Sequence, residues 1–289
     1  MDFFSVEKVT DRVLRISGLI SEFMYLVQGS RRALLIDTGC GAGNLREFVR
    51  SITDLPLTVV LTLTHGHYDH AGGAGRFDEV WVNPVELEPT PIHYQRGATF
   101  DKLRASHPSL RLEDMTPDAD FCLADGPGDG TSVVCRPLTP GMRFSLGGIS
   151  VEAIPCPGHT PGTYCMLIEE ERLLLTGDAC HSISYLFFDN ALSIEEYREN
   201  LLTLKQQDDR WDSLLLSHPV SAAPKCMLDE VISLCGEILK GTTDEIPYPW
   251  QGKPVFIAKA VDQQMLRKDG VYGNIIFRKD KIHRAHQPE

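Results

Sequence analysis

The sequence predicts an α+β fold on the strength of three observations. Short apolar runs rich in Val, Ile and Leu recur along the chain, and such runs are typical of buried strands. Fewer segments carry apolar residues at helical spacing. Several apolar runs end in a His or an Asp, and in layered folds the carboxyl ends of strands are where ligands bind. We therefore expect a layered core with polar side chains gathered along one edge.

The first elements follow from the apolar pattern and from the Gly and Ser residues that interrupt it. Strands are expected at residues 11–18, 22–29, 32–37, 57–63 and 79–83. A helix is expected over residues 44–53, because Leu45, Phe48 and Val49 fall on one side of it.

Residues 84–131 interrupt this pattern with Pro, Gly and polar residues, and the stretch is long for a connection between core strands. We interpret it as a mainly helical, lid-like insertion within a single domain that spans residues 1–289. Because loops on a rigid scaffold carry specificity, we expect this insertion to select the substrate. The alternative is a surface helical pair that packs on itself, with His93 and His107 in solvent.

The β pattern then resumes and continues to the end of the chain. Further strands are expected at residues 132–137, 151–154, 172–176, 213–216, 254–260 and 272–278. Helices are expected over residues 193–206 and 224–239.

The segment from His65 to His70 holds three imidazoles and a carboxylate within six residues, directly after an apolar run. Residues two apart in an extended segment project to the same side, so His65 and His67 can converge on one ion. Asp69 and His70 lie beyond the bend and can face a second ion. Imidazoles mixed with a carboxylate suit zinc, and also iron or manganese.

Three later apolar runs end in His159, Asp178 and His218. Any one of these residues alone is an ordinary turn or capping group. Together with the first motif they supply five His and two Asp. Such a set can give each of two metals three terminal ligands and a shared Asp, with a water or hydroxide between the ions.

The order HGHYDH, PGHTPG, TGD and SHP resembles the metallo-β-lactamase superfamily over most of the chain. The resemblance implies a four-layer αβ/βα sandwich. Carried over position by position, it implies one metal bound by His65, His67 and His159, a second bound by Asp69, His70 and His218, and Asp178 as the bridge. The pattern is most similar to hydroxyacylglutathione hydrolases (glyoxalase II) and related lactonases.

The implied activity is hydrolysis by a dinuclear metal site, in which a metal-bridging hydroxide attacks a small ester, thioester or lactone. Asp69 is expected to bind metal and also to orient the nucleophile or carry a proton. His181 and Tyr185 follow Asp178, and either is a candidate catalytic donor to the oxyanion. Core packing is the alternative for Tyr185.

Two other classes of function share this motif set. A phosphodiesterase or nucleic-acid-processing hydrolase is expected to carry a basic exosite, and this chain shows only the short basic stretch 278–284. An iron-dependent oxidoreductase resembling the persulfide dioxygenases is the other class, and metal analysis separates it from a zinc hydrolase. A flavodiiron protein is disfavoured by His67, where that family typically has Glu.

Composition favours a cytoplasmic enzyme with a small-molecule substrate. The formal net charge of −12 disfavours nucleic acid and anionic membranes as partners. No apolar stretch approaches the ~20 residues that span a bilayer. Eight cysteines without a CxxC pair are expected to be reduced thiols, with Cys156 and Cys180 as apolar filler beside the site or as members of it. The oligomeric state stays open, a homodimer included.

Overall fold

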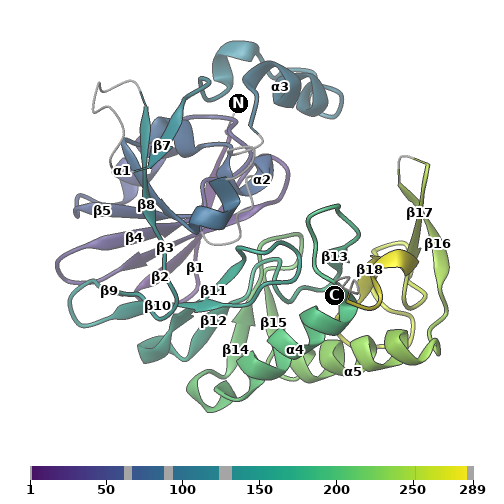
Figure 1. Cartoon of the computed structure of the whole chain (residues 1–289). Helices are drawn as coiled ribbons and strands as arrows, with labels where there is room; N and C mark the ends of the chain where they lie inside the picture. Colours follow the sequence, from purple (N-terminus) through teal and green to yellow (C-terminus); the bar gives the residue numbers. More distant parts are fainter. Residues whose placement is uncertain (1, 62–66, 88–93, 124–131, 251, 285–289) are drawn as a thin grey trace. The chain divides into compact units, whose positions relative to one another are not determined.

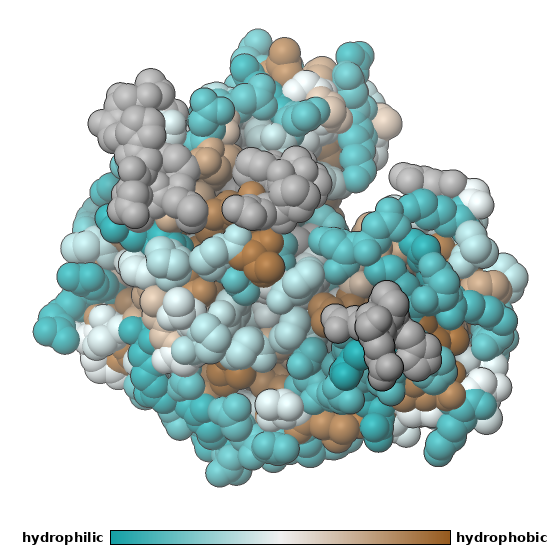
Figure 2. All heavy atoms as spheres, in the orientation of Figure 1, coloured by the Kyte–Doolittle hydropathy of each residue, from teal (hydrophilic) through white to brown (hydrophobic). Residues whose placement is uncertain are grey.

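The computed structural model describes residues 2–61, 67–87, 94–123, 132–250 and 252–284. The chain forms two compact units, residues 1–153 and 154–289, and each is described by itself below. The predicted single-domain organisation over residues 1–289 stays a prediction. On the face drawn in Figure 2, hydrophilic residues cover most of the surface and hydrophobic residues appear in smaller patches.

The first unit is built on an eight-stranded mixed sheet with strand order β1-β2-β3-β4-β5-β6-β8-β7 (Figure 1). Strands β1 to β4 pair antiparallel, and β4, β5, β6, β8 and β7 pair parallel. The strands are β1 Ser5–Lys8, β2 Val13–Ser17, β3 Phe23–Gln28, β4 Ala33–Ile36, β5 Leu57–Val60, β6 Glu79–Val82, β7 Phe121–Leu123 and β8 Val133–Pro137. A hairpin of β9 Arg143–Ser145 and β10 Ser150–Pro155 follows.

The first unit also carries the helices α1 Leu45–Ile52, α2 Tyr68–Ala71 and α3 Arg96–Arg104, with 3₁₀ turns at Ala74–Arg76, Pro84–Leu87 and Leu112–Asp114. Helix α1 begins where the sequence predicts, because the Asn44 side chain accepts a hydrogen bond from the Glu47 N–H. Leu45 and Val49 lie one turn apart and are buried, which fixes the helix on the sheet.

The described part of the predicted insertion, residues 84–131, holds α3, two 3₁₀ turns and strand β7. Strand β7 pairs with β8 at the edge of the sheet, so this part of the segment belongs to the sheet and not to a helical cover. Leu103, Leu110 and Met115 are buried in one cluster with Cys40 and Ala42. The described residues around Leu103, Leu110 and Met115 are therefore packed into the first unit.

The second unit holds two groups of strands and two long helices. One group has the order β15-β14-β12-β11, and the other is a four-stranded sheet with the order β13-β18-β17-β16. The strands are β11 Tyr164–Ile168, β12 Leu173–Leu175, β13 Ser184–Leu186, β14 Ser213–Leu215, β15 Ala222–Pro224, β16 Ile246–Trp250, β17 Lys253–Ile257 and β18 Ile275–Arg278. The 3₁₀ turns are Glu169–Glu171, Asp208–Arg210 and Lys279–Lys281.

Helices α4 Ile194–Lys205 and α5 Met227–Lys240 run side by side in this unit (Figure 1). Ser193 and Glu196 form a capping box that starts α4, and Tyr197 is among the buried residues of its inner face. Gly241 ends α5 with the left-handed conformation that favours glycine. In the described part of the chain, every helix is too short or too polar to cross a membrane.

Candidate metal centre

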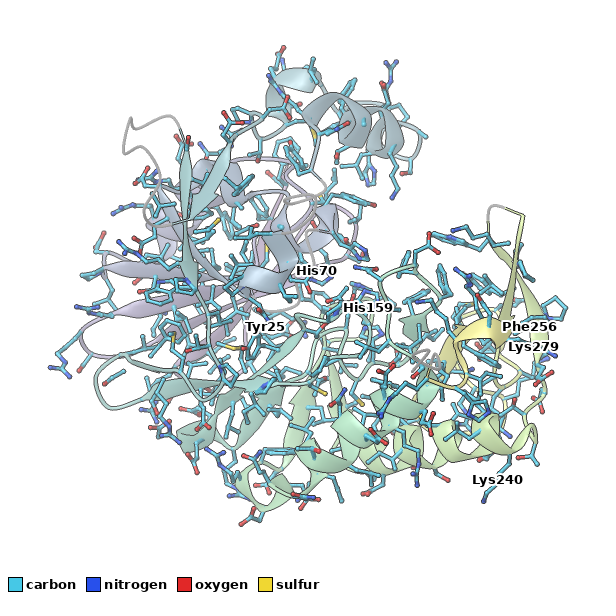
Figure 3. All side chains as sticks on the ribbon, viewed as in Figure 1. Tyr25, His70, His159, Lys240, Phe256 and Lys279 are labelled. Atoms are coloured by element: carbon cyan, nitrogen blue, oxygen red, sulfur yellow. The ribbon has the colours of Figure 1, made fainter. Side chains whose placement is uncertain are left out.

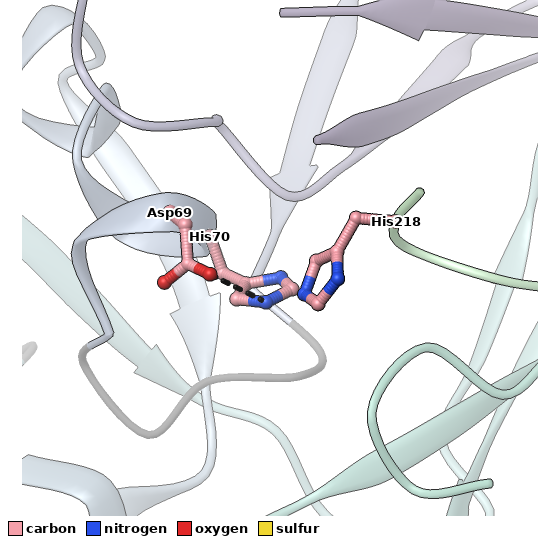
Figure 4. A group of neighbouring side chains, drawn as sticks. All are labelled: Asp69, His70 and His218. Atoms are coloured by element: carbon pink, nitrogen blue, oxygen red, sulfur yellow. Dashed lines mark ion pairs between the residues drawn. The ribbon is translucent and has the colours of Figure 1, made fainter. Parts of the chain in front are cut away.

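The first unit presents part of the His-rich motif on helix α2, which follows β5. His67 occupies the N-cap position without a capping hydrogen bond from its side chain, and Asp69 and His70 lie within the helix. The His70 side chain is almost fully buried, and its Nε2 lies 3.7 Å from Asp69 Oδ2, as the dashed line in Figure 4 marks. His65 lies outside the described residues.

Asp37 orients the His70 ring from the end of strand β4. The ring Nδ1 and Asp37 Oδ2 are 3.2 Å apart, and both side chains are buried. When the Asp37 oxygen accepts this hydrogen bond, Nδ1 is the donor and Nε2 is the ring nitrogen beside Asp69. The Thr38 N–H and hydroxyl both donate to the His70 carbonyl, at 2.7 and 2.9 Å, and hold the backbone as well.

Asp37 is not among the residues that the sequence motifs predict for the site, although one signal for it is present in the sequence. The run Ala33–Ile36 ends in an Asp, as the ligand-bearing runs do. Asp37 also has a positive φ of 64°, which is uncommon for a residue other than glycine. A strained backbone at the end of a strand is typical of a functional position.

We expect Asp37→Ala to weaken metal binding at His70 by roughly 10- to 100-fold, the usual cost of losing such a supporting carboxylate. The measurement is the zinc dissociation constant by competition with a chelator. Asp54→Ala is the matched control, because Asp54 is exposed in the same unit. An unchanged dissociation constant in a folded Asp37→Ala protein would contradict the orienting role.

The second unit places two imidazoles on the two oxygens of one buried carboxylate. Asp178 follows β12 and is 5% exposed. Its Oδ2 lies 3.5 Å from His159 Nε2, and its Oδ1 lies 3.4 Å from His218 Nε2. Two ligand atoms about 2.1 Å from a tetrahedral ion lie roughly 3.4 Å apart, so these separations suit ligands that share a metal. Each oxygen of Asp178 thus has a histidine of its own.

Hydrogen bonds hold the loops that carry these residues in place. His159 Nδ1 donates to the Tyr185 carbonyl at 2.6 Å, which turns Nε2 toward Asp178 (His159 is labelled in Figure 3). The Ser217 hydroxyl donates to Asp178 Oδ1. Tyr197 of α4 donates to the Ala179 carbonyl at 2.7 Å.

Gly158 is required beside His159 because of its close approach to α4. A Cβ at Gly158 would lie 2.2 Å from Tyr197 Cδ2, closer than van der Waals contact allows. The PGHTPG motif therefore combines a metal-type His with a glycine that lets its loop lie on the helix.

His181 lies beside this carboxylate, since the ligand-type atoms of Asp178, His181 and His218 lie within 4.8 Å of one another. The Ile183 backbone N–H donates to His181 Nδ1 at 3.3 Å. Burial lowers the pKa of His181 to about 3, so the ring is neutral near pH 7. In a neutral ring whose Nδ1 accepts, Nε2 carries the proton.

The Nε2 atom of His181 is buried and has no hydrogen-bond partner among the described residues. A buried donor without a partner is costly and is typical of a position that a ligand completes. This chemistry suits a hydrogen-bond donor to substrate, as the sequence predicts, better than it suits a metal ligand. Tyr185, the other predicted donor, is half-buried. Its backbone carbonyl accepts the hydrogen bond from His159 Nδ1.

Cys156 and Cys180 are completely buried in the core of the second unit, beside the residues above. Burial raises the pKa of the Cys180 thiol well above its usual value, so the thiol stays protonated. The cysteines whose side chains the structure describes are all free, as the sequence predicts.

Residues 18–218 match the family model of the Metallo-beta-lactamase superfamily. The chain belongs to this superfamily. Its fold is similar to those of solved structures: a metallo-beta-lactamase from Pontibacter korlensis aligns over 80% of this chain and 97% of that chain, with a TM-score of 0.54 and 17% identity. The sec-alkylsulfatase Pisa1 from Pseudomonas sp. aligns over 82% of this chain and 42% of that chain, with a TM-score of 0.56 and 15% identity.

Curated relatives within the superfamily include two kinds of thioesterase. Acyl-coenzyme A thioesterase MBLAC2 of Gallus gallus is 26% identical over 201 residues, which are 65% of this chain and 68% of that protein. Atrochrysone carboxyl ACP thioesterase nsrC of Aspergillus novofumigatus is 26% identical over 247 residues, 82% of this chain and 61% of that protein. This chain thus spans about two thirds of the length of these relatives.

The comparisons confirm the predicted enzyme class, a hydrolase of the metallo-β-lactamase fold, and His and Asp groups that suit a metal are present. These relatives are named as thioesterases of acyl-CoA and of ACP, so they do not support the finer resemblance to glyoxalase II. The complete set of seven metal ligands stays a prediction.

Proposed function

We propose that the protein is a dinuclear metal-dependent thioesterase that hydrolyses a small-molecule acyl thioester. The observation that carries the proposal is the Asp178 carboxylate, whose two oxygens each lie beside the Nε2 of a different histidine, His159 and His218. The relatives named as thioesterases favour a thioester over the esters and lactones that the sequence leaves open.

The residues of both units fit divalent metal ions by their donor chemistry. Each unit turns a histidine Nε2 toward a carboxylate by tying its Nδ1 to an acceptor, Asp37 for His70 and the Tyr185 carbonyl for His159. We propose zinc as the native metal, because imidazole nitrogens with carboxylate oxygens are its usual ligands outside thiolate sites. Iron and manganese are the comparators.

A metal held by these residues would supply Lewis-acid activation of the substrate carbonyl and a hydroxide nucleophile near neutral pH. Side chains of the protein then stabilise the charge that develops on the substrate and carry the proton. The Nε2–H of His181 donates to the oxyanion that forms as the thioester carbonyl is attacked. The carboxylate of Asp69, which is 24% exposed, accepts the O–H proton of the tetrahedral intermediate as the C–S bond breaks and passes it to the leaving thiolate, which gives a carboxylate and a thiol.

We propose that the segment 84–131, which belongs to the first unit, selects the substrate. Lys102 of α3 places its Nζ 4.1 Å from the ring centroid of Tyr68, the residue before Asp69. This contact brings the segment to the metal motif, where a specificity element belongs.

A substrate panel tests the proposal. Purified protein reconstituted with zinc is assayed against acyl-CoA, acyl-phosphopantetheine and glutathione thioesters, lactones, β-lactams, and phosphodiesters that include RNA. We expect the highest kcat/KM for an acyl thioester. Cleavage of phosphodiesters without turnover of any thioester would overturn the proposal and favour the nucleic-acid-processing alternative.

A further inference from the structure

Four aromatic side chains of the second unit form a continuous group beside His159. They come from two segments far apart in the sequence, strand β13 with the loop after it and the end of strand β16. Ring centroids are 5.8 Å apart for Tyr185 and Phe187, 4.4 Å for Phe187 and Phe188, and 4.9 Å for Phe187 and Trp250. Phe188 and Trp250 meet edge to face at 6.1 Å.

The aromatic group reaches the candidate metal centre at one end. The ring of Phe188 meets the His159 ring edge to face, with centroids 5.4 Å apart. The Tyr185 carbonyl accepts the hydrogen bond from His159 Nδ1. An apolar surface therefore begins directly at His159, a proposed metal ligand of the thioesterase.

The four aromatic side chains differ in how far they are buried. Phe187 is 1% exposed and packs with Ile183, Val255, Ile257 and Ile276 in one cluster. Tyr185, Phe188 and Trp250 are only partly buried, although aromatic side chains gain most from complete burial. The cluster thus has a rigid base and three aromatic residues that still offer surface to a ligand.

Trp250 also lies in a part of the chain that the superfamily model does not cover. That match ends at residue 218, whereas Trp250 sits at residue 250 on a hairpin that pairs β16 with β17. The aromatic group is therefore completed by an element outside the region that the superfamily model matches. Such an addition to a shared metal site suits substrate choice better than it suits the hydrolytic step.

We propose that Tyr185, Phe188 and Trp250 form a shelf that binds the acyl group of the substrate and selects thioesters with long apolar or aromatic acyl groups. The proposal rests on the proposed thioesterase function. Apolar area removed from water on binding supplies the preference, and flat rings suit both alkyl chains and aromatic acyl groups.

The test compares the ratio of kcat/KM for a long-chain acyl thioester to that for the acetyl thioester with the same thiol. We expect Trp250→Ala and Phe188→Ala to lower this ratio roughly 10-fold or more, the range for apolar discrimination in a pocket. Trp250→Phe, which keeps a ring, should retain most of the ratio. Tyr272→Ala is the matched control, because Tyr272 is 50% exposed in the same unit and lies outside the aromatic group, and its ratio should equal that of the wild type.

A binding arm separates failure of the shelf from failure of the thioesterase proposal. The dissociation constant of a thioether analogue of the long-chain substrate is measured by calorimetry on the same folded variants. Weaker binding to Trp250→Ala supports the shelf even if the wild type hydrolyses no thioester, which would sink the proposed activity alone. An unchanged dissociation constant and an unchanged ratio in folded Trp250→Ala and Phe188→Ala would overturn the shelf.

Discussion

Asp178→Ala is expected to lower kcat/KM on the best thioester by about 10³-fold or more and to reduce bound metal. The reason is that both oxygens of this carboxylate are committed, one beside His159 and one beside His218. Loss of a single oxyanion donor already costs about 10²- to 10³-fold, and a shared metal ligand supports more of the site than one donor does. The measurements are steady-state kinetics and elemental analysis on the same samples.

Two further variants make this result specific. Asp178→Asn keeps the volume of the side chain and removes its charge, so it distinguishes loss of a ligand from a packing defect. Asp209→Ala removes an exposed carboxylate of the same unit and should leave both metal content and rate unchanged. Full metal content and full activity in Asp178→Ala would show that this residue is not part of the metal centre.

His181→Phe is expected to lower kcat by roughly 10²- to 10³-fold, the usual cost of removing one donor to an oxyanion. The Ile183 N–H fixes the proton of the neutral ring on Nε2, and burial keeps the ring uncharged. Phe keeps the aromatic volume in the core but removes the donor. Metal content should therefore stay at the wild-type value while kcat falls.

The comparison with Tyr185→Phe decides between the two predicted donors. This variant removes only the hydroxyl and keeps the carbonyl that holds His159, so we expect a smaller loss of kcat than in His181→Phe. His181→Gln restores a donor and should recover part of the rate. The opposite ranking would assign the donor to Tyr185, and loss of metal in His181→Phe would make His181 a ligand.

Local signals predicted much of the secondary structure because their causes are local. The helix expected over residues 193–206 is α4, Ile194–Lys205, since Ser193 and Glu196 cap it within one turn. The strand β16 was missed because Pro247 and Pro249 argue against a strand. The two prolines are tolerated because β16 is an edge strand, which pairs only with β17 in the described sheet.

The long-range parts of the site needed the structure. Asp37 and His70 are 33 residues apart, and no spacing rule predicts that the Asp37 carboxylate orients the His70 ring. The tautomer of His181 likewise depends on one backbone N–H. By contrast, His159, Asp178 and His218 were predicted from the residues that end apolar runs, because strands deliver such residues to one edge.

Stepwise metal reconstitution tests the central claim, a dinuclear metal-dependent hydrolase, most directly. Metal is removed with a chelator, zinc is added back in known equivalents, and thioester hydrolysis and bound metal are measured at each step, with iron and manganese in parallel. We predict an inactive metal-free protein, two ions per chain at saturation, and a rate that rises until the second equivalent is bound. Thioester hydrolysis by the metal-free protein, or saturation at one ion or fewer, would contradict it.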